Sequence, residues 1–170
     1  MATVTPSYSS KTALTITLAS LAADATQVAG RESNQVDNTT NKYSTALLEG
    51  FVTVGTTPTI NKTVLVYVWG AGESLATTAK DSLDGTDSDE TIATAGVRDG
   101  FLKLAATLIV DSTTSNRRYD FGEVDVAAVL GVAVLPPFWG VFVTQNTGVS
   151  LNATGGNHAI SFVGIKYDVA

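Results

Sequence analysis

The chain is patterned mainly with the two-residue period of β-strands. Residues 12–18 place Leu14, Ile16 and Leu18 on one face and threonines on the other, which is typical of a half-buried strand. Similar patterns recur between turn residues, and residues 101–110 place their apolar side chains on one side. About eight such segments predict an all-β fold, an antiparallel jelly-roll β-sandwich. These segments are residues 12–18, 45–54, 63–69, 101–110, 119–126, 138–144 and 159–169, with a weak strand around residues 26–29.

Two apolar segments depart from simple alternation. Residues 63–69 are apolar on both faces, which predicts a central strand that is covered twice. Residues 126–143 carry no charge and approach the length of a bilayer span. However, Pro136 and Pro137 interrupt this run, and tandem proline breaks a helix. We therefore expect two buried β segments joined by a Pro-Pro turn, and no membrane partner.

The polar segments are expected to lie at the surface. Residues 24–43 predict a long surface loop, and residues 73–83 are the one plausible helix. The polar, proline-containing residues 1–11 predict a flexible N-terminal arm that orders on binding. Residues 12–170 are then the single folded domain.

Composition narrows the classes of function. Charged residues make up only 15% of the chain, and the formal net charge is −6. An acidic surface repels phosphate, so nucleic acid is not an expected partner. The chain has no cysteine, which excludes disulfides, thiol nucleophiles and cysteine-based zinc sites. The first residues lack the basic and apolar regions of a secretory signal.

Gly70-Ala71-Gly72 follows a predicted strand and partly matches a dinucleotide-binding turn. The third glycine of that motif is missing, and no alternation of strands and helices follows. We interpret this segment as a flexible exit from the sheet.

The acidic run in residues 81–90 contains Asp81, Asp84, Asp87, Asp89 and Glu90. Clustered carboxylates can bind calcium, but this spacing does not match an EF-hand loop. A solvated acidic loop is the primary interpretation, and a cation site is the alternative.

No assembled catalytic group is visible in the sequence. The only histidine, His158, lies in a turn, and there is no Gly-x-Ser-x-Gly motif. Asp120, Glu123 and Asp125 could form the carboxylate pair of a glycosidase. We expect them instead to solvate the outer face of a strand and to pair with neighbouring arginines. The sequence predicts a protein that is not an enzyme and has no cofactor.

The aromatic residues could form a sugar-stacking platform, but most must fill the core or an interface between subunits. Trp139 is expected at an edge because it follows the Pro-Pro turn. The predicted interface residues are Trp69, Pro136, Pro137, Phe138 and Trp139.

The C-terminal third resembles tailed-bacteriophage structural proteins. The resemblance rests on Asp125–Gly131, on Leu135–Val143 and on Asn146-Thr147-Gly148-Val149-Ser150-Leu151, with a final strand behind them. Elsewhere it extends only to the layout of strands.

The resemblance implies a capsid decoration, or cement, protein on the capsid exterior of the virion. Its expected partners are the major capsid protein and further copies of itself, as a homotrimer. Head fibres and tail parts also use this fold, and no catalytic residues carry over. The alternative is a carbohydrate-binding module of a phage fibre or receptor-binding protein, for which an exposed Trp69 or Trp139 would be evidence.

Overall fold

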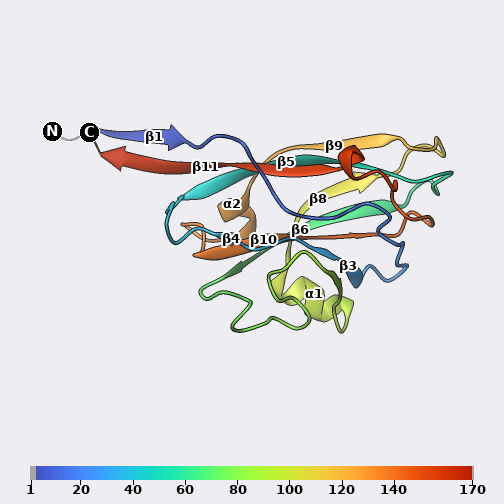
Figure 1. Ribbon diagram of the computed structural model, residues 1–170, viewed down its shortest axis with the longest axis horizontal. Coiled ribbons are helices and arrows are strands. Elements are labelled where there is room, and N and C mark those ends of the chain that lie inside the picture. The colour runs from blue at the N-terminus through green and yellow to red at the C-terminus, as the bar shows by residue number, and fades with distance from the viewer. Residues whose placement is uncertain (1–2, 170) are drawn as a thin grey trace.

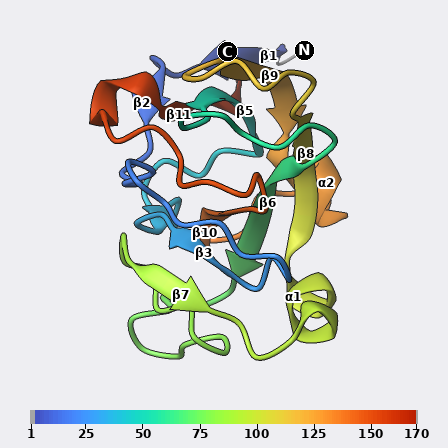
Figure 2. The same ribbon diagram turned by 90° about the vertical axis from the view of Figure 1, so that its right-hand side faces the viewer.

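The computed structural model describes residues 3–169, which form two antiparallel sheets packed face to face (Figures 1 and 2). The predicted all-β sandwich is confirmed. No helix in the described part of the chain is long and apolar enough to cross a membrane.

The first sheet has five strands in the order β1-β11-β5-β9, and the short β2 also pairs with β11. Its strands are β1 (Val4–Tyr8), β2 (Thr12–Ala13), β5 (Thr45–Thr53), β9 (Arg118–Asp125) and β11 (Ala159–Val169).

The second sheet has six strands in the order β7-β3-β10-β6-β8, and β4 pairs with β10. Its strands are β3 (Ala29–Glu32), β4 (Val36–Asp37), β6 (Thr63–Ala71), β7 (Asp89–Thr91), β8 (Lys103–Ile109) and β10 (Phe138–Gln145).

The strand pairs are nested along the chain. β1 and β2 pair with β11, β3 pairs with β10, β5 pairs with β9, and β6 pairs with β8. The chain therefore forms successive antiparallel pairs, with its first and last strands together and β6 and β8 innermost.

The core lies between the sheets, and a second apolar cluster lies outside the second sheet. Val64, Val66 and Val68 of β6 face the core, whereas Tyr67 and Trp69 face the outer cluster. Residues 72–102, including α1 (Ala95–Phe101), cover that outer side (Figure 2). The prediction that residues 63–69 are covered on both faces is confirmed.

The predictions for residues 73–83 and for the part of residues 126–143 before the prolines were wrong. Residues 73–83 form turns, and the helix is α1, where the Thr94 hydroxyl accepts a hydrogen bond from the Val97 amide. Before the prolines, residues 126–143 form no strand and begin with the helix α2 (Val126–Leu130). The Asp125 carboxylate caps its start, and left-handed Gly131 ends it.

Three strand predictions also needed correction. In residues 12–18 only β2 is a strand, although Leu14 and Leu18 are buried as the alternation predicted. Residues 24–43 contain β3 and β4 rather than a long loop with a strand at 26–29. A register shift between β6 and β8 places Leu104 opposite Tyr67, and Leu104 is exposed instead of sharing the core face with Leu108.

Candidate interaction surface

The outer faces of the two sheets differ in how much of the chain covers them. The second sheet is covered by residues 72–102, whereas no described segment lies over the first sheet in Figures 1 and 2. Leu47, Val163 and Ile165 are only partly buried on this open face, because β5 and β11 place them opposite the core-facing Leu48 and Phe162. This side of the sandwich therefore presents these apolar groups beside the Lys11–Glu49 and Arg118–Asp120 ion pairs.

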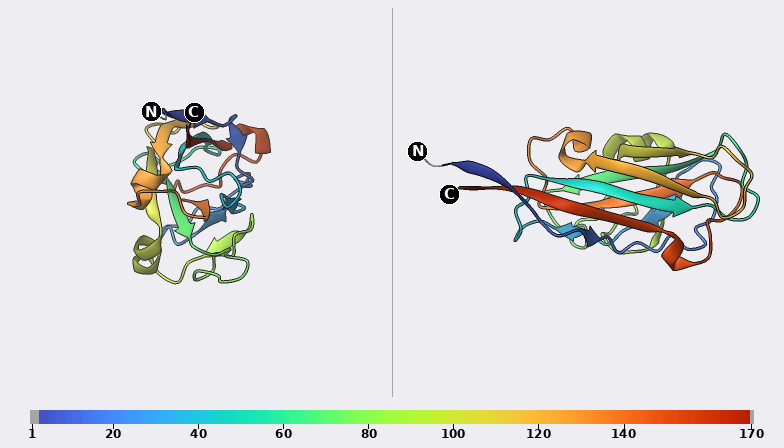
Figure 3. Two further views of the ribbon diagram at one scale, coloured as in Figure 1. Left: turned by 90° about the vertical axis from the view of Figure 1, so that its left-hand side faces the viewer. Right: turned by 90° about the horizontal axis from the view of Figure 1, so that it is seen from above.

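The open face continues into a two-stranded ribbon made by β1 and the end of β11. Figures 1 and 3 show this ribbon projecting beyond the body of the sandwich, where Val4 pairs with Val169. Val4–Tyr8 thus forms a paired strand in a segment that was predicted to be a flexible arm. Residues 1 and 2 of that predicted arm lie outside the described residues.

The ribbon is amphipathic. Directly opposed residues of an antiparallel pair share a face, and the register pairs Pro6 with Tyr167 and Tyr8 with Ile165. Alternation adds Val4 to the same face, so every side chain described there is apolar or aromatic. Val4, Tyr8 and Tyr167 are 61%, 63% and 61% exposed. The other face is polar and carries Thr5, Ser7, Lys166 and Asp168.

Pro6 protects the outer edge of this ribbon. The Ser9 amide donates to the Gly164 carbonyl at 2.9 Å, and backbone groups alternate in direction along an antiparallel pair. Pro6, three residues before Ser9, therefore has its nitrogen on the open edge, where it offers no donor to an added strand. The apolar face, rather than the edge, is the accessible contact surface of the ribbon.

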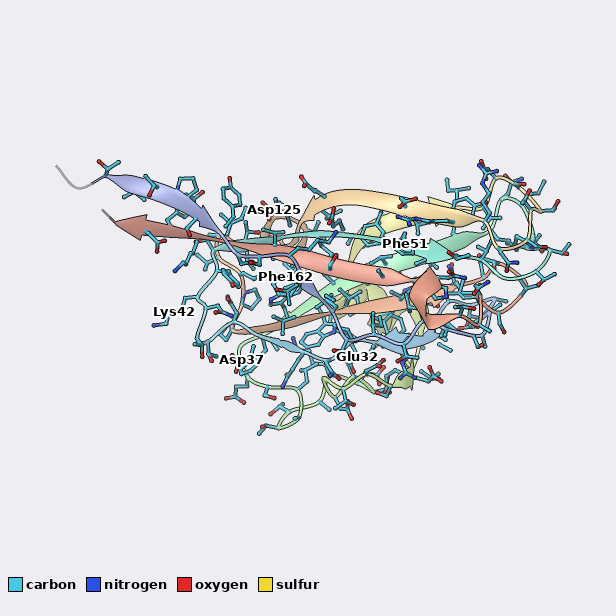
Figure 4. The ribbon with its side chains drawn as sticks, turned by 45° about the horizontal axis from the view of Figure 1, so that its top comes forward. Glu32, Asp37, Lys42, Phe51, Asp125 and Phe162 are labelled. Atoms are coloured by element: carbon cyan, nitrogen blue, oxygen red, sulfur yellow. The ribbon has the colours of Figure 1, made fainter. Side chains whose placement is uncertain are left out.

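A recess of about 540 Å³ lies near the base of the ribbon. The Tyr43 ring lies where a Cβ on Gly164 would be, and the Leu135 amide donates to the Ser44 carbonyl at 2.7 Å. Lys42 lies at this same end of the molecule (Figure 4). The lining residues are Asn38, Thr39, Lys42, Tyr43, Val134, Leu135, Pro136 and Pro137.

The side chain of Asn38 connects the segments that line this recess by hydrogen bonds. Its side-chain amide donates to the Tyr43 carbonyl at 3.0 Å, and its side-chain oxygen accepts from the Tyr43 amide at 2.8 Å. The same NH₂ group also lies 3.4 Å from the Leu135 carbonyl. One buried side chain therefore connects the two segments that line the recess.

Two of the five predicted interface residues are not at the surface. Trp69 and Trp139 are both 0% exposed, which contradicts the predicted edge position of Trp139. The reason is that β10 is an interior strand, in which Trp139 pairs with Gly70 and packs edge-on against Phe162 with ring centroids 5.1 Å apart. Pro136, Pro137 and Phe138 remain partly or fully exposed.

The candidate catalytic residues do not form a catalytic arrangement. The His158 ring accepts from the Thr53 amide at 3.3 Å, its other nitrogen lies 2.9 Å from the Asn152 carbonyl, and burial lowers its pKa. Both ring nitrogens are thus occupied by the backbone.

The three carboxylates that were candidates for a glycosidase pair have structural roles or lie in solvent. Asp120 pairs with Arg118, as expected, and Asp125 accepts a hydrogen bond from the Thr45 hydroxyl while capping α2. Glu123 is exposed.

The acidic loop is tied to the second sheet rather than freely solvated. Asp87 pairs with Arg31 at 2.6 Å and accepts from the Thr17 amide and hydroxyl at 2.9 and 2.6 Å. Its pKa is lowered by the hydrogen bonds from Arg31 and Thr17, which outweigh the opposing effect of burial.

Glu32 is a buried acid that sequence reasoning missed because it lies in the polar stretch 24–43. Its carboxylate accepts from the Asp84 and Gly85 amides, and burial raises its pKa to about 8. The oxygens of Glu32, Asp84 and Glu90 lie within 4.8 Å of one another. Hard cations bind such oxygens, so these three groups are where the chain could hold one.

Comparison of the chain with protein-family models, curated proteins and solved structures finds no match.

Proposed function

We propose that this chain is a structural subunit of a tailed-phage virion, a decoration protein that binds the outer surface of the capsid. The observation that supports this most directly is the uncovered apolar face of the ribbon, which continues onto Val163 and Leu47 of the open face of the first sheet. Exposed apolar surface of this kind is typical of sites that bind other proteins. The resemblance of the C-terminal third to phage structural proteins is the reason for proposing a phage virion as the assembly.

The nested strand pairs support the finer assignment to a jelly roll. Folding one long antiparallel arrangement into two facing sheets produces the two Greek keys of that fold. Such a sandwich is rigid and presents its loops and edge strands at fixed positions, as a repeated subunit requires.

The charge favours a position outside the shell. A chain with a net charge of −6 is repelled by a packaged genome but attracted by any basic patch on the outer capsid surface. In the acidic loop, the Asp89 side chain is 78% exposed and adds to the negative charge of the surface.

The observations do not favour the carbohydrate-binding alternative. Both tryptophans are buried, and the guanidinium group of Arg118 lies over the Phe51 ring, 3.5 Å from its centroid. The exposed Tyr8 and Tyr167 lie on an apolar ribbon face, whereas a sugar site also needs polar groups beside its aromatic rings.

The proposal is tested by adding the purified chain to capsid shells of the phage that encodes it and sedimenting the shells. We expect saturable binding, together with a higher temperature of shell disruption. The added chain remaining in the supernatant at all concentrations would contradict the proposal, as would its absence from purified virions.

A further inference from the structure

We propose that the apolar face of the β1–β11 ribbon of one copy docks in the Pro136–Pro137 recess of a second copy of this chain. The inference concerns the isolated protein in solution and does not depend on the proposed capsid role. It rests on two surfaces of complementary chemistry that the same chain presents.

The first surface is an aromatic projection. Tyr8 and Tyr167 lie on the same ribbon face, and each leaves about three-fifths of its surface exposed. No segment between residues 3 and 169 covers them, because the ribbon extends beyond the sandwich (Figure 3). Tyrosines with flanking apolar groups are typical anchors of protein interfaces, because their rings bury a large area with little loss of conformational freedom.

The second surface is the recess, whose lining suits such an anchor. Val134, Leu135 and the two prolines form an apolar wall, and Tyr43 adds an aromatic ring. Val134 is 61% exposed although its neighbour Leu135 is buried. The volume of about 540 Å³ is ample for a tyrosine side chain, and Asn38 holds the two lining segments in place.

A second copy of this chain can occupy the recess because its apolar ribbon face brings no charge that opposes the contact. Two chains of −6 repel each other wherever their carboxylates meet. The apolar ribbon face carries no charge, and the ribbon's Lys166 and Asp168 pair with each other on its opposite face at 3.4 Å. Among the described residues that line the recess, Lys42 alone is charged, and it is positive. These two surfaces therefore meet without opposing like charges.

The size of the contact indicates how many such contacts each copy needs for stable association. The two tyrosines together expose roughly 250 Å², whereas a stable interface buries about 800 Å² on each partner. One ribbon in one recess is thus a small contact. A chain that uses both its ribbon and its recess doubles the contact area, so we expect association to be strongest when every copy uses both.

Two variants test the ribbon and the recess independently. Tyr8→Ser combined with Tyr167→Ser removes the aromatic anchors, and Val134→Asp places a carboxylate in the recess. Both changes fall on exposed side chains, so the fold is expected to survive, which thermal melting checks. Ile60→Asp is the matched control, because Ile60 is 48% exposed in a loop away from the ribbon.

Light scattering then measures the mass of each protein and of the mixed variants. We expect the wild type and Ile60→Asp to associate, and each ribbon or recess variant to have a Kd raised roughly tenfold or more. Mixing the two variants should give 1:1 pairs that are weaker than the wild-type association, because only one intact ribbon meets one intact recess in each pair.

Three results would overturn the inference. A monomeric wild type at its highest soluble concentration excludes the contact. Unchanged association of Val134→Asp excludes the recess as the docking site, and a mixture that stays monomeric shows that ribbon and recess do not bind each other. Failure to bind capsids leaves these measurements unaffected.

Discussion

At the residue scale, Glu32 shows how burial and hydrogen bonding compete over one carboxyl group. Two backbone amides favour its ionised form, whereas burial favours the neutral form and is the larger effect, so that its pKa rises to about 8. Between pH 4.5 and about 8, the Glu32 carboxyl therefore holds a proton in the folded state, whereas the same group has released it in the unfolded chain, where its pKa is near 4.5.

This shift predicts a pH-dependent stability. The contribution of Glu32 is fully present below pH 4.5 and is lost as the pH rises through about 8. Between these values, the free energy of unfolding should fall by up to about 1.4 kcal/mol per pH unit from this group. Urea denaturation measured across this range should show the slope, and Glu32→Gln should remove it.

Asp37→Asn is the control for Glu32→Gln. The Asp37 pKa is lowered by hydrogen bonds from the Thr39 hydroxyl and amide. The contribution of Asp37 to the free energy of unfolding is therefore lost only in acid. The slope of this free energy between pH 4.5 and 8 should remain in Asp37→Asn. An unchanged slope in Glu32→Gln would mean that Glu32 is already ionised in the folded protein.

Gly140 gives a second prediction at this scale. A Cβ at this position would lie 2.5 Å from the buried Trp69 ring, closer than carbon atoms can pack. Gly140→Ala should lower the free energy of unfolding by about 1–3 kcal/mol because the ring must move within a full core. Gly156→Ala is the control, since nothing lies within 4 Å of its Cβ. Equal stability of both variants in urea denaturation would count against the packing of β10 on Trp69.

At the scale of elements, the sequence predicted the long strands but not the short helices. Residues 63–69 are apolar on both faces and form a doubly covered strand, because few other structures would bury the apolar side chains on both faces of this segment. Residues 126–130 are equally apolar but form α2, and a short apolar run fits either structure. The distinguishing signals were the cap at Asp125 and the left-handed Gly131.

The contact surface was partly predictable for the same reason. Pro136 and Pro137 were expected at an interface and line the recess, whereas Trp69 and Trp139 are core residues of paired strands. The ribbon was missed because Val4–Tyr8 is short, and its alternation of apolar and polar residues has meaning only once its pairing with β11 is known.

Pro6 carries a prediction for the ribbon as an element. Pro6→Val would add a backbone donor at the outer edge of β1, and we expect this variant to form larger aggregates through edge-to-edge pairing. Thr5→Val is the control, because it raises β propensity without adding a donor at the edge. Similar turbidity and light scattering for the two variants would show that Pro6 does not protect the edge.

At the scale of the whole molecule, the two sheets have different surroundings. The second sheet is covered by its own chain through residues 72–102, whereas no described segment covers the outer face of the first sheet and the ribbon (Figures 1 and 2). The acidic net charge opposes contact between copies, while the ribbon and recess provide a route that avoids it.

Salt should therefore act in opposite directions on the two kinds of binding. Self-association is expected to strengthen as salt rises, because screening weakens the repulsion between chains of −6. Binding to a basic capsid patch should weaken over the same range. Light scattering and shell co-sedimentation at matched salt concentrations measure the two effects. Self-association that weakens with salt would show that opposite charges, rather than apolar groups, dominate the contact.

Hydrogen exchange of the wild-type chain, free at low concentration and bound to capsid shells, tests the central claim most directly. The account predicts that binding slows exchange in the ribbon, residues 3–9 and 163–169, and in the recess wall, residues 132–137. Unchanged exchange there, with new protection over α1 and residues 72–94 instead, would contradict it.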